Sequence, residues 1–474
     1  MFRLFFILSL SLVVMSGNSQ TVIGTTSHPE ATANHNQRKI VRDSLDNVYV
    51  IYSDSVGAGC GIFGVVYDRN SDQWSAPLEM LAGKNPTIAI SKIGRIFLVF
   101  ESQTDTSAIY YSASDDFSAW SQPQRLSDSG TCAVLPVADV DSLGNLNVFW
   151  IEHETANSDK LKYCRMQSDT VQLFSTILER DTIRDVAVAN NLSYVGIELF
   201  YALEFNNDSI LFFRSSDKMQ TTELVYAAKG HSPCITFNQI FGEMPDAGSS
   251  VRLLYIDNTG DLTEVDASSP LFDDVHSATS PIGSVDEICI DNMAPPIGFS
   301  FLYQKNNKFY HGFSYGIYFN WISALDSIES NPIHPTIAYK HFNFYYVDYV
   351  WMEDNGSGYN VFHKRDAKHV WVGTEDHEVG KGFSITGSPN PFSDILTIRV
   401  QTDKPESIPE VKVFDSASRL VKILAPEMLA AGDYSFQWNG ENLNGNKVST
   451  GVYVIICTNA ENRTARKVVF AGAY

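Results

Sequence analysis

Seven charged or imidazole-bearing residues stand at or just before short apolar segments that are typical of β-strands. They are Arg38, Arg184, Asp185, His231, Asp286, Glu287 and His334. Arginines bind anionic and hydroxyl groups through charge-assisted hydrogen bonds, and two suitably separated carboxyl groups can hydrolyse a glycosidic bond. Either chemistry requires that distant parts of the chain bring these side chains together. The alternative is that they are solvated loop residues that pair with one another.

A sequence repeat would bring them together. The phrase Pro-Thr-Ile-Ala occurs at residues 86–89 and again at residues 335–338, each time followed by a turn and an apolar run that ends in aromatic residues. Further copies begin near Arg38, Pro136, Ile183, Ser232 and Val285. The chain therefore carries seven copies at a spacing of about 50 residues, between roughly residues 30 and 380.

Each copy predicts four short β-strands. An apolar strand, a turn such as SLDN or DSLGN, and a strand such as VYVIY or LNVFW come first, followed by a tyrosine-rich strand and a Trp-Ser-x-Pro phrase. Four strands per period of 40 to 50 residues are typical of a propeller blade. We therefore predict an all-β fold in which residues 20–380 form a seven-bladed β-propeller, or a six-bladed one if a weak copy is incomplete. The segment TVIGTTS at 21–27 is a candidate strand to complete the last blade.

The residues just before each innermost strand of a propeller line the mouth of its channel, where ligands commonly bind. The seven residues named above are thus a predicted site for a glycan or protein ligand. Asp139, Asp141 and Asn145 superficially resemble a calcium loop, but sibling copies have a turn at this position, which favours a hairpin. No zinc spacing, phosphate-binding glycine loop or Ser-His-Asp order is present, so we expect no metal and no cofactor.

One segment, YSASDDFSAWSQP at 111–123, resembles the Asp-box of sialidase-like propellers. Asp115 and Trp120 match that motif, whereas Ala113 and Phe117 replace its Ser and Gly. A sialidase needs three arginines that clamp the substrate carboxylate. Arg38 and Arg184 would supply two, and the sequence shows no convincing third. The resemblance therefore implies the fold more than the activity, with a binding propeller as the first hypothesis and a sialidase-like glycoside hydrolase as the alternative.

The first 19 residues are typical of a secretory signal peptide, with Arg3 before an apolar run at 4–15 that is too short to span a bilayer. No later stretch predicts a transmembrane segment. The formal net charge of −21 argues against a nucleic-acid partner. The six cysteines show no CxxC pair, and Cys234 and Cys289 lie in apolar strand patterns that predict buried thiols.

The repeat ends near residue 380. After a linker at 381–388, residues 389–474 predict a small antiparallel sandwich, because alternating strands such as DILTIRV and VKVFDS are separated by Asn-Gly and Ser-Thr-Gly turns. This region resembles the C-terminal sorting domain of proteins exported by the type IX secretion system of Bacteroidetes-like bacteria. The matching residues are Pro389, Asn390, Pro391, Phe392, Trp438, Gly440, Gly451, Tyr453 and Lys467.

This resemblance implies a partner and a destination. The type IX machinery would recognise the C-terminal domain and carry the protein across the outer membrane, so that it is secreted or attached to the cell surface. An ordinary immunoglobulin-like domain that helps to bind a ligand is the alternative interpretation.

Overall fold

The computed structural model describes residues 20–472 of the chain with internal gaps. The gaps are 44, 92, 104–106, 142, 156–157, 181, 191–198, 239–249, 269–273, 292, 295–297, 316–319, 329–330, 340–345, 368–382, 403–409, 416–419, 426–431, 444 and 459–462. The predicted signal peptide lies outside these residues. The described residues are all-β and include no helix that could cross a membrane. The chain divides into two compact units, of which the first ends at Ala367.

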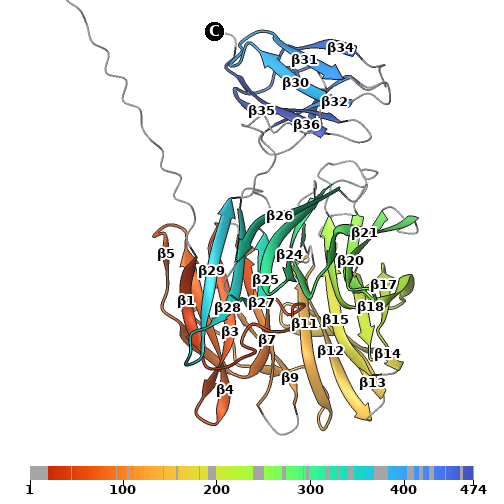
Figure 1. Cartoon of the computed structure of the whole chain (residues 1–474). Helices are drawn as coiled ribbons and strands as arrows, with labels where there is room; N and C mark the ends of the chain where they lie inside the picture. The colour runs from red at the N-terminus through yellow and green to blue at the C-terminus, as the bar shows by residue number, and fades with distance from the viewer. Residues whose placement is uncertain are drawn as a thin grey trace, which may run out of the picture. The chain divides into compact units, whose positions relative to one another are not determined.

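In the first unit, the first three copies of the repeat each fold as one antiparallel sheet (Figure 1). Their strands are β2 (Ile40–Arg42), β3 (Val48–Val56), β4 (Gly59–Asp68), β5 (Gln73–Trp74) and β6 (Leu78–Ala82); then β7 (Lys84–Ile90), β8 (Ile96–Glu101), β9 (Ile109–Ser114) and β10 (Gln124–Arg125); then β11 (Cys132–Val140), β12 (Leu146–Thr155), β13 (Ser158–Gln167) and β14 (Thr170–Arg180). Each sheet follows chain order from first to last strand, apart from β6, which pairs with β4.

The fourth and fifth copies share a strand. β15 (Ile183–Asn190), β16 (Leu199–Phe205) and β17 (Ser209–Ser215) lead into β18 (Glu223–Asn238), which continues into β19 (Ser250–Asp257), β20 (Asp261–Ser268) and β21 (Asp274–Ser284), while β23 (Met293–Ala294) pairs with β18. The first half of β18 pairs with β17 and its second half with β19. Thus β18 is the last strand of one copy and the first strand of the next.

The sixth copy forms the sheet of β22 (Glu287–Ile290), β24 (Gly298–Lys305), β25 (Lys308–Tyr315) and β26 (Asn320–Ile328). The seventh forms β27 (Ile333–Tyr339), β28 (Tyr346–Asp354) and β29 (Tyr359–Ala367), and β1 (Thr21–Thr26) is its fourth strand. As the sequence predicts, the segment at 21–27 completes this sheet, with Thr26 opposite Tyr359.

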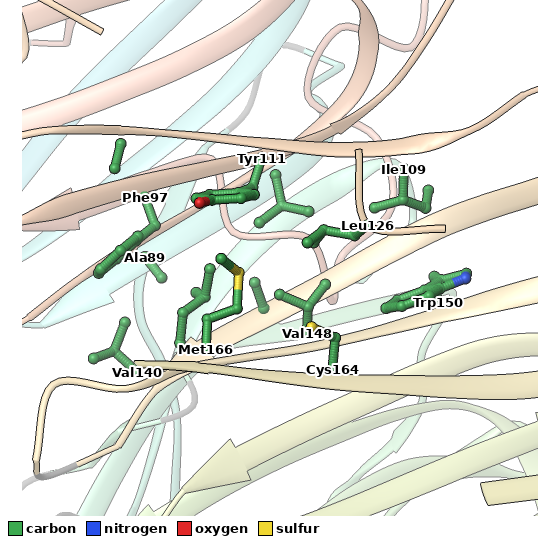
Figure 2. Packing of buried hydrophobic residues seen from close by; sticks show 14 of the residues in the cluster. Ala89, Phe97, Ile109, Tyr111, Leu126, Val140, Val148, Trp150, Cys164 and Met166 are labelled. Carbon is green, nitrogen blue, oxygen red and sulfur yellow. The ribbon is translucent and has the colours of Figure 1, made fainter. Parts of the chain in front are cut away.

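Burial explains why the strands differ in composition. All residues of β8 and of β16 are buried, so these second strands are continuous apolar runs rather than alternating ones. The outer strand β14 is largely exposed and mixes polar with apolar residues. Figure 2 shows the packing between two sheets, in which Ile109 and Tyr111 of one sheet face Val148 and Met166 of the next. Sheets that pack face to face on both sides require apolar residues on both faces of their inner strands.

The second unit is a small sandwich of two antiparallel sheets (Figure 1). One sheet holds β30 (Phe383–Ser388), β31 (Leu396–Thr402) and β34 (Gly432–Trp438), and the other holds β33 (Leu420–Ala425), β32 (Glu410–Asp415), β35 (Gly451–Thr458) and β36 (Arg463–Phe470). Residues 383–388 of the predicted linker form β30 and pair with β31, so the sandwich starts before residue 389.

Candidate functional site

The X-Pro phrase of the repeat forms a β-bulge in the first strand of a copy. The register of the first strand shifts at this phrase in four copies, including Lys84/Thr87 and Val134/Val137, and β15 has a similar shift at Ile183/Asp185 without a proline. The residue before each proline has a positive φ, as at Leu135 (51°) and Ser232 (55°). Proline suits a bulge because it has no N–H to contribute to the ladder. The bulge places a backbone carbonyl at an equivalent position of the first strand in several copies.

These carbonyls accept hydrogen bonds from the N-terminal strap, which we define as residues 21–39. The donors are Lys39 Nζ to the Pro86 oxygen, Gln37 Nε2 to Pro136 (3.0 Å), Asn36 Nδ2 to Pro233 (2.8 Å) and Thr32 Oγ1 to His334 (2.7 Å). The strap also contacts Asp185 of β15, and its His35 carbonyl accepts from the Cys289 thiol of β22. The first strands of six copies of the repeat therefore meet on one short segment.

Arg38 lies within the strap and points between two acids. Its Nη2 is 3.1 Å from Asp291 and 3.8 Å from Asp139, and 14% of its side chain is exposed. Asp139 in turn accepts from both the backbone N–H and the side chain of Asn190. Arg38 is thus already paired inside the protein, and not free at a surface to clamp an anionic ligand.

A second group, which we name the mouth cluster, surrounds the strap residue His35. It consists of His35, Asp185, Glu204, His231 and Glu287. His35 Nε2 is 3.2 Å from Asp185 Oδ2, which also accepts from Asn36 Nδ2 at 2.8 Å. Glu204 accepts the Ser232 N–H at 2.7 Å, and His231 Nδ1 lies 3.1 Å from the Ser232 hydroxyl.

Burial dominates the electrostatics of the mouth cluster. It raises the pKa of Asp185, and His35 partly offsets this effect. It also raises the pKa of Glu204, to which the nearby Asp185 carboxylate adds, and the pKa of Glu287, which His35 lowers in part. Three carboxyl groups therefore hold their protons more tightly than in water, around one imidazole.

Of the other predicted residues, Arg184 lies at the edge of this group and Asp286 is not shown in contact with it. Arg184 is 45% exposed and bonds Asn206 and Asp208 at 2.8 Å, with Glu204 at 3.7 Å. Asp286 is exposed and makes a backbone bond to Gln304.

His334 contributes its carbonyl to the strap, and burial lowers its pKa. Of the seven predicted residues, then, Asp185, His231 and Glu287 share one site, and Arg38 and Arg184 do not meet.

Sequence reasoning missed Glu204, although its pattern is periodic. Glutamates recur at the ends of second strands at a spacing of about 50 residues, namely Glu101, Glu152, Glu204 and Glu353. Glu101 accepts the Leu135 N–H at 2.8 Å just as Glu204 accepts the Ser232 N–H. In both cases a carboxylate holds the bulge of the next copy, where the backbone donor would otherwise be unpaired.

The sequence analysis also missed a buried charge network. Asp348 is fully buried and contacts Arg42 Nη1 at 2.8 Å, His363 Nε2 at 2.7 Å and Arg365 Nε at 2.8 Å. These residues join the sheets of the first and seventh copies. Arg42 lowers the pKa of Asp348 against the effect of burial, and His363 and Arg365 add to it.

In the segment at 111–123, the turn is closed by the residue after the predicted Asp115. The carboxylate that closes the turn is Asp116, which accepts from the N–H groups of Ser118 (2.9 Å) and Ala119 (3.0 Å). These bonds lower the pKa of Asp116 to about 2. Asp115 is instead exposed and pairs with Arg95 at 2.7 Å. The side chain of Trp120 donates to the Phe117 carbonyl, which packs the turn against the sheet.

The hairpin interpretation of the DSLGN segment is confirmed. Asp141 Oδ1 accepts from the N–H groups of Leu143 (3.0 Å) and Asn145 (2.9 Å), and Gly144 takes a positive φ of 83°. Asp141 also pairs with Arg165 at 3.0 Å. The carboxylate is therefore used within the turn.

In the sandwich, the residues that carry the sorting-domain resemblance mainly build the core. Phe392, Trp438 and Tyr453 are buried, and the Trp438 ring meets Phe392 at a tilt and Tyr453 edge to face. Gly440 lies against the Phe470 ring with φ of 75°, where a Cβ would come within 2.8 Å of a ring atom. Asn390 accepts the Val469 N–H at 2.8 Å.

Of the remaining residues of this set, Pro389 and Pro391 are exposed, and Gly451 begins β35. Lys467 lies in β36, and its side chain is outside the described residues.

The C-terminal unit resembles a known domain family. Residues 392–462 match the family model of the FlgD Ig-like domain. The C-terminal unit thus has an immunoglobulin-like domain. No curated protein sequence matches the chain.

Solved structures that resemble the chain include glycan-processing enzymes. A polysaccharide lyase of a new family, an ulvan lyase, aligns over 74% of this chain and 96% of its own with a TM-score of 0.51 and 10% identity. A Hadza microbial sialidase covers 73% of this chain and 68% of its own (TM-score 0.46, 10% identity). A Trypanosoma rangeli sialidase covers 93% and 86% (TM-score 0.42, 9% identity). At these identities the likeness concerns the fold alone.

The strap makes stability depend on pH through Lys39. Burial lowers the pKa of Lys39 from 10.5 to about 7, against the opposing effect of Glu101. Between these values the unfolded chain binds a proton that the folded chain does not, so folding becomes more favourable as pH rises. We expect the free energy of unfolding to gain about 2 kcal/mol more between pH 7 and pH 9 in the wild type than in Lys39→Met. Denaturant titrations of both proteins measure this difference, and equal pH dependence would contradict the prediction.

Proposed function

We propose that the first unit is a closed seven-bladed β-propeller that binds a glycan at the channel mouth. Two observations support closure: β1 completes the sheet of the seventh copy, and the first strands of six copies all contact the strap. The mouth cluster lies at this point of convergence. The fold-level likeness to an ulvan lyase is compatible with a glycan ligand.

The pairing of Arg38 and Arg184 with carboxylates is the observation on which we base the class of ligand. Arg38 is held by Asp139 and Asp291, and Arg184 by Asp208. Both guanidinium groups pair with carboxylates and they share no partner, which argues against a clamp for an anionic sugar. The mouth cluster instead offers carboxyl, imidazole and amide groups, which suit the hydroxyl groups of an uncharged saccharide. We therefore favour a binding propeller for uncharged glycans.

A glycoside hydrolase is the second candidate. Asp185 and Glu204 are close enough to act on each other, and the pKa of both is raised. Glycosidases use a pair of carboxyl groups of which one is kept protonated as the general acid. Against this function, Glu204 already accepts a backbone N–H and Asp185 two strap groups.

We further propose that the protein is exported by its N-terminal signal peptide and by type IX recognition of the C-terminal unit, and that it is secreted or surface-attached. The support is the order of motifs in the sequence together with the immunoglobulin-like domain at residues 392–462.

One experiment separates the binding and hydrolytic functions. The chain from residue 20 onwards, with variants Asp185→Asn and Glu204→Gln and the control Asp115→Asn, is screened on a glycan array and against fluorogenic glycosides. We expect saturable binding of an uncharged glycan that weakens about 10-fold or more in Asp185→Asn, because a charge-assisted acceptor is lost. The exposed control should bind as the wild type does.

The outcomes are distinct. Turnover that Glu204→Gln abolishes would replace the binding function by the hydrolase. Exclusive binding of sialylated or uronic-acid glycans would contradict the uncharged ligand. The absence of both binding and turnover would overturn a glycan function altogether.

A further inference from the structure

The N-terminal strap follows an unusual path. Its first part, β1, is the outer strand of the sheet of the seventh copy, with Val22 opposite Phe362. The chain then passes over the end of β3, where Asp54 accepts from the Ser27 N–H at 2.8 Å and Ser53 donates to the Ala31 carbonyl at 3.1 Å. It ends among the first strands of the other sheets. One segment of 19 residues thus links the edge of one sheet to the point where the first strands of six copies converge.

The part of the strap at the convergence point carries positive or protonatable groups into acidic surroundings. His35 faces Asp185, Arg38 faces Asp139 and Asp291, and Lys39 lies in the field of Glu101. Thr32, Gln37 and Lys39 are each no more than 2% exposed. Without the strap, these carboxylates would line an open acidic channel, and the bulge carbonyls would lose the partners that the strap supplies.

The strap is held differently from the rest of the unit. Residues 27–39 make no strand ladder, and their contacts are mainly side-chain hydrogen bonds to carbonyls and carboxylates. Only β1 is in a ladder, and only on one side, with β29. Releasing residues 21–39 therefore breaks one edge pairing, a set of polar contacts and the packing of Ile23 and Ala31 in the core of the first and seventh copies, while the other strands of the seven copies keep their ladders. Segments held in this way open at lower free energy than the whole fold.

We propose that residues 21–39 are a gate that docks and releases as one unit. When docked, the strap seals the channel at the bulges and neutralises its acids. When released, it exposes Asp139, Asp185 and Asp291 and removes β1 from β29. The inference rests on the contacts of the strap and does not depend on the proposed glycan ligand.

Native-state hydrogen exchange of the chain from residue 20 onwards tests the gate. Arg38→Gln removes the charge that faces Asp139 and Asp291, which are distant in sequence from β1. We expect the amides of β1 and those of residues 31–39 to exchange faster by the same factor, about 10- to 100-fold, while β7, β8 and β12 exchange as in the wild type. Asn36→Ala, which loses the bonds to Asp185 and Pro233, provides a milder second variant.

The surface variant Arg95→Gln is the matched control, because it also removes an arginine paired with two aspartates but lies outside the strap. It should leave the exchange of β1 unchanged. Faster exchange confined to residues 31–39 would overturn the proposal, since β1 would then be independent. Faster exchange of all sheets together would overturn it equally, because the strap would not be separable from the fold.

Discussion

Replacing Asp348 with alanine is expected to lower the free energy of unfolding of the first unit by about 3–5 kcal/mol. Asp348 is fully buried and contacts Arg42, His363 and Arg365. Its removal leaves two guanidinium groups and an imidazole next to one another without their shared carboxylate. The side chain of Arg42 is itself fully buried and cannot turn to water. Urea titration of the wild type and the variant measures the loss.

The control for this prediction is Asp115→Ala. Asp115 also pairs with an arginine, Arg95 at 2.7 Å, but 75% of its side chain is exposed. Exposed pairs contribute about 0–1 kcal/mol, so this variant should unfold nearly as the wild type does. Losses of similar size in both variants would contradict the role assigned to burial.

The Asp348 network also sets a pH dependence. The pKa of Asp348 is lowered in the folded protein. The contribution of this carboxylate to stability is therefore present above the pKa of an unfolded aspartate, near 4, and is lost as pH falls below that value. The Asp348→Ala variant should therefore lose less stability on acidification than the wild type.

Replacing Trp438 with alanine is expected to cost the sandwich about 3–5 kcal/mol, which is a large share of the stability of so small a domain. The indole is 1% exposed and packs against Phe392, Tyr453 and Phe470. Its Nε1 donates to the Glu441 carbonyl at 2.9 Å, and the variant removes this donor. Differential scanning calorimetry should show the transition of the sandwich shifted or missing.

The transition of the first unit should stay in place, because the two units are compact by themselves. Leu443→Ala is the matched control in the same unit, since Leu443 is 50% exposed. A wild-type-like transition of the sandwich in Trp438→Ala would contradict the prediction.

Much of the fold could be predicted from local pattern. The X-Pro phrases, the turns and the apolar second strands each have a local physical cause, namely a bulge without a donor, a positive φ and burial on both faces. Strand β30 was missed since Phe383–Ser388 is rich in small and polar residues.

The site was predictable only in part. Asp185 and Glu287 occupy the bulge position where sibling copies have proline, so the alignment of copies placed them together. The strap was not predictable, because its Thr, Asn and Gln side chains bind backbone carbonyls. Every residue has such a carbonyl, so the sequence does not show which of them accept these bonds. For the same reason Arg38 appeared as a free ligand-binding group, whereas the fold pairs it with Asp139 and Asp291.

The shared strand β18 affects how this repeat could have gained or lost copies. Other neighbouring sheets are connected by loops, at which a copy can be duplicated or deleted without cutting a strand. The 16 residues of β18 leave no such joint between the fourth and fifth copies. Any recombination that moves one of these copies must split a paired strand, so the two would be inherited as a single exchangeable block.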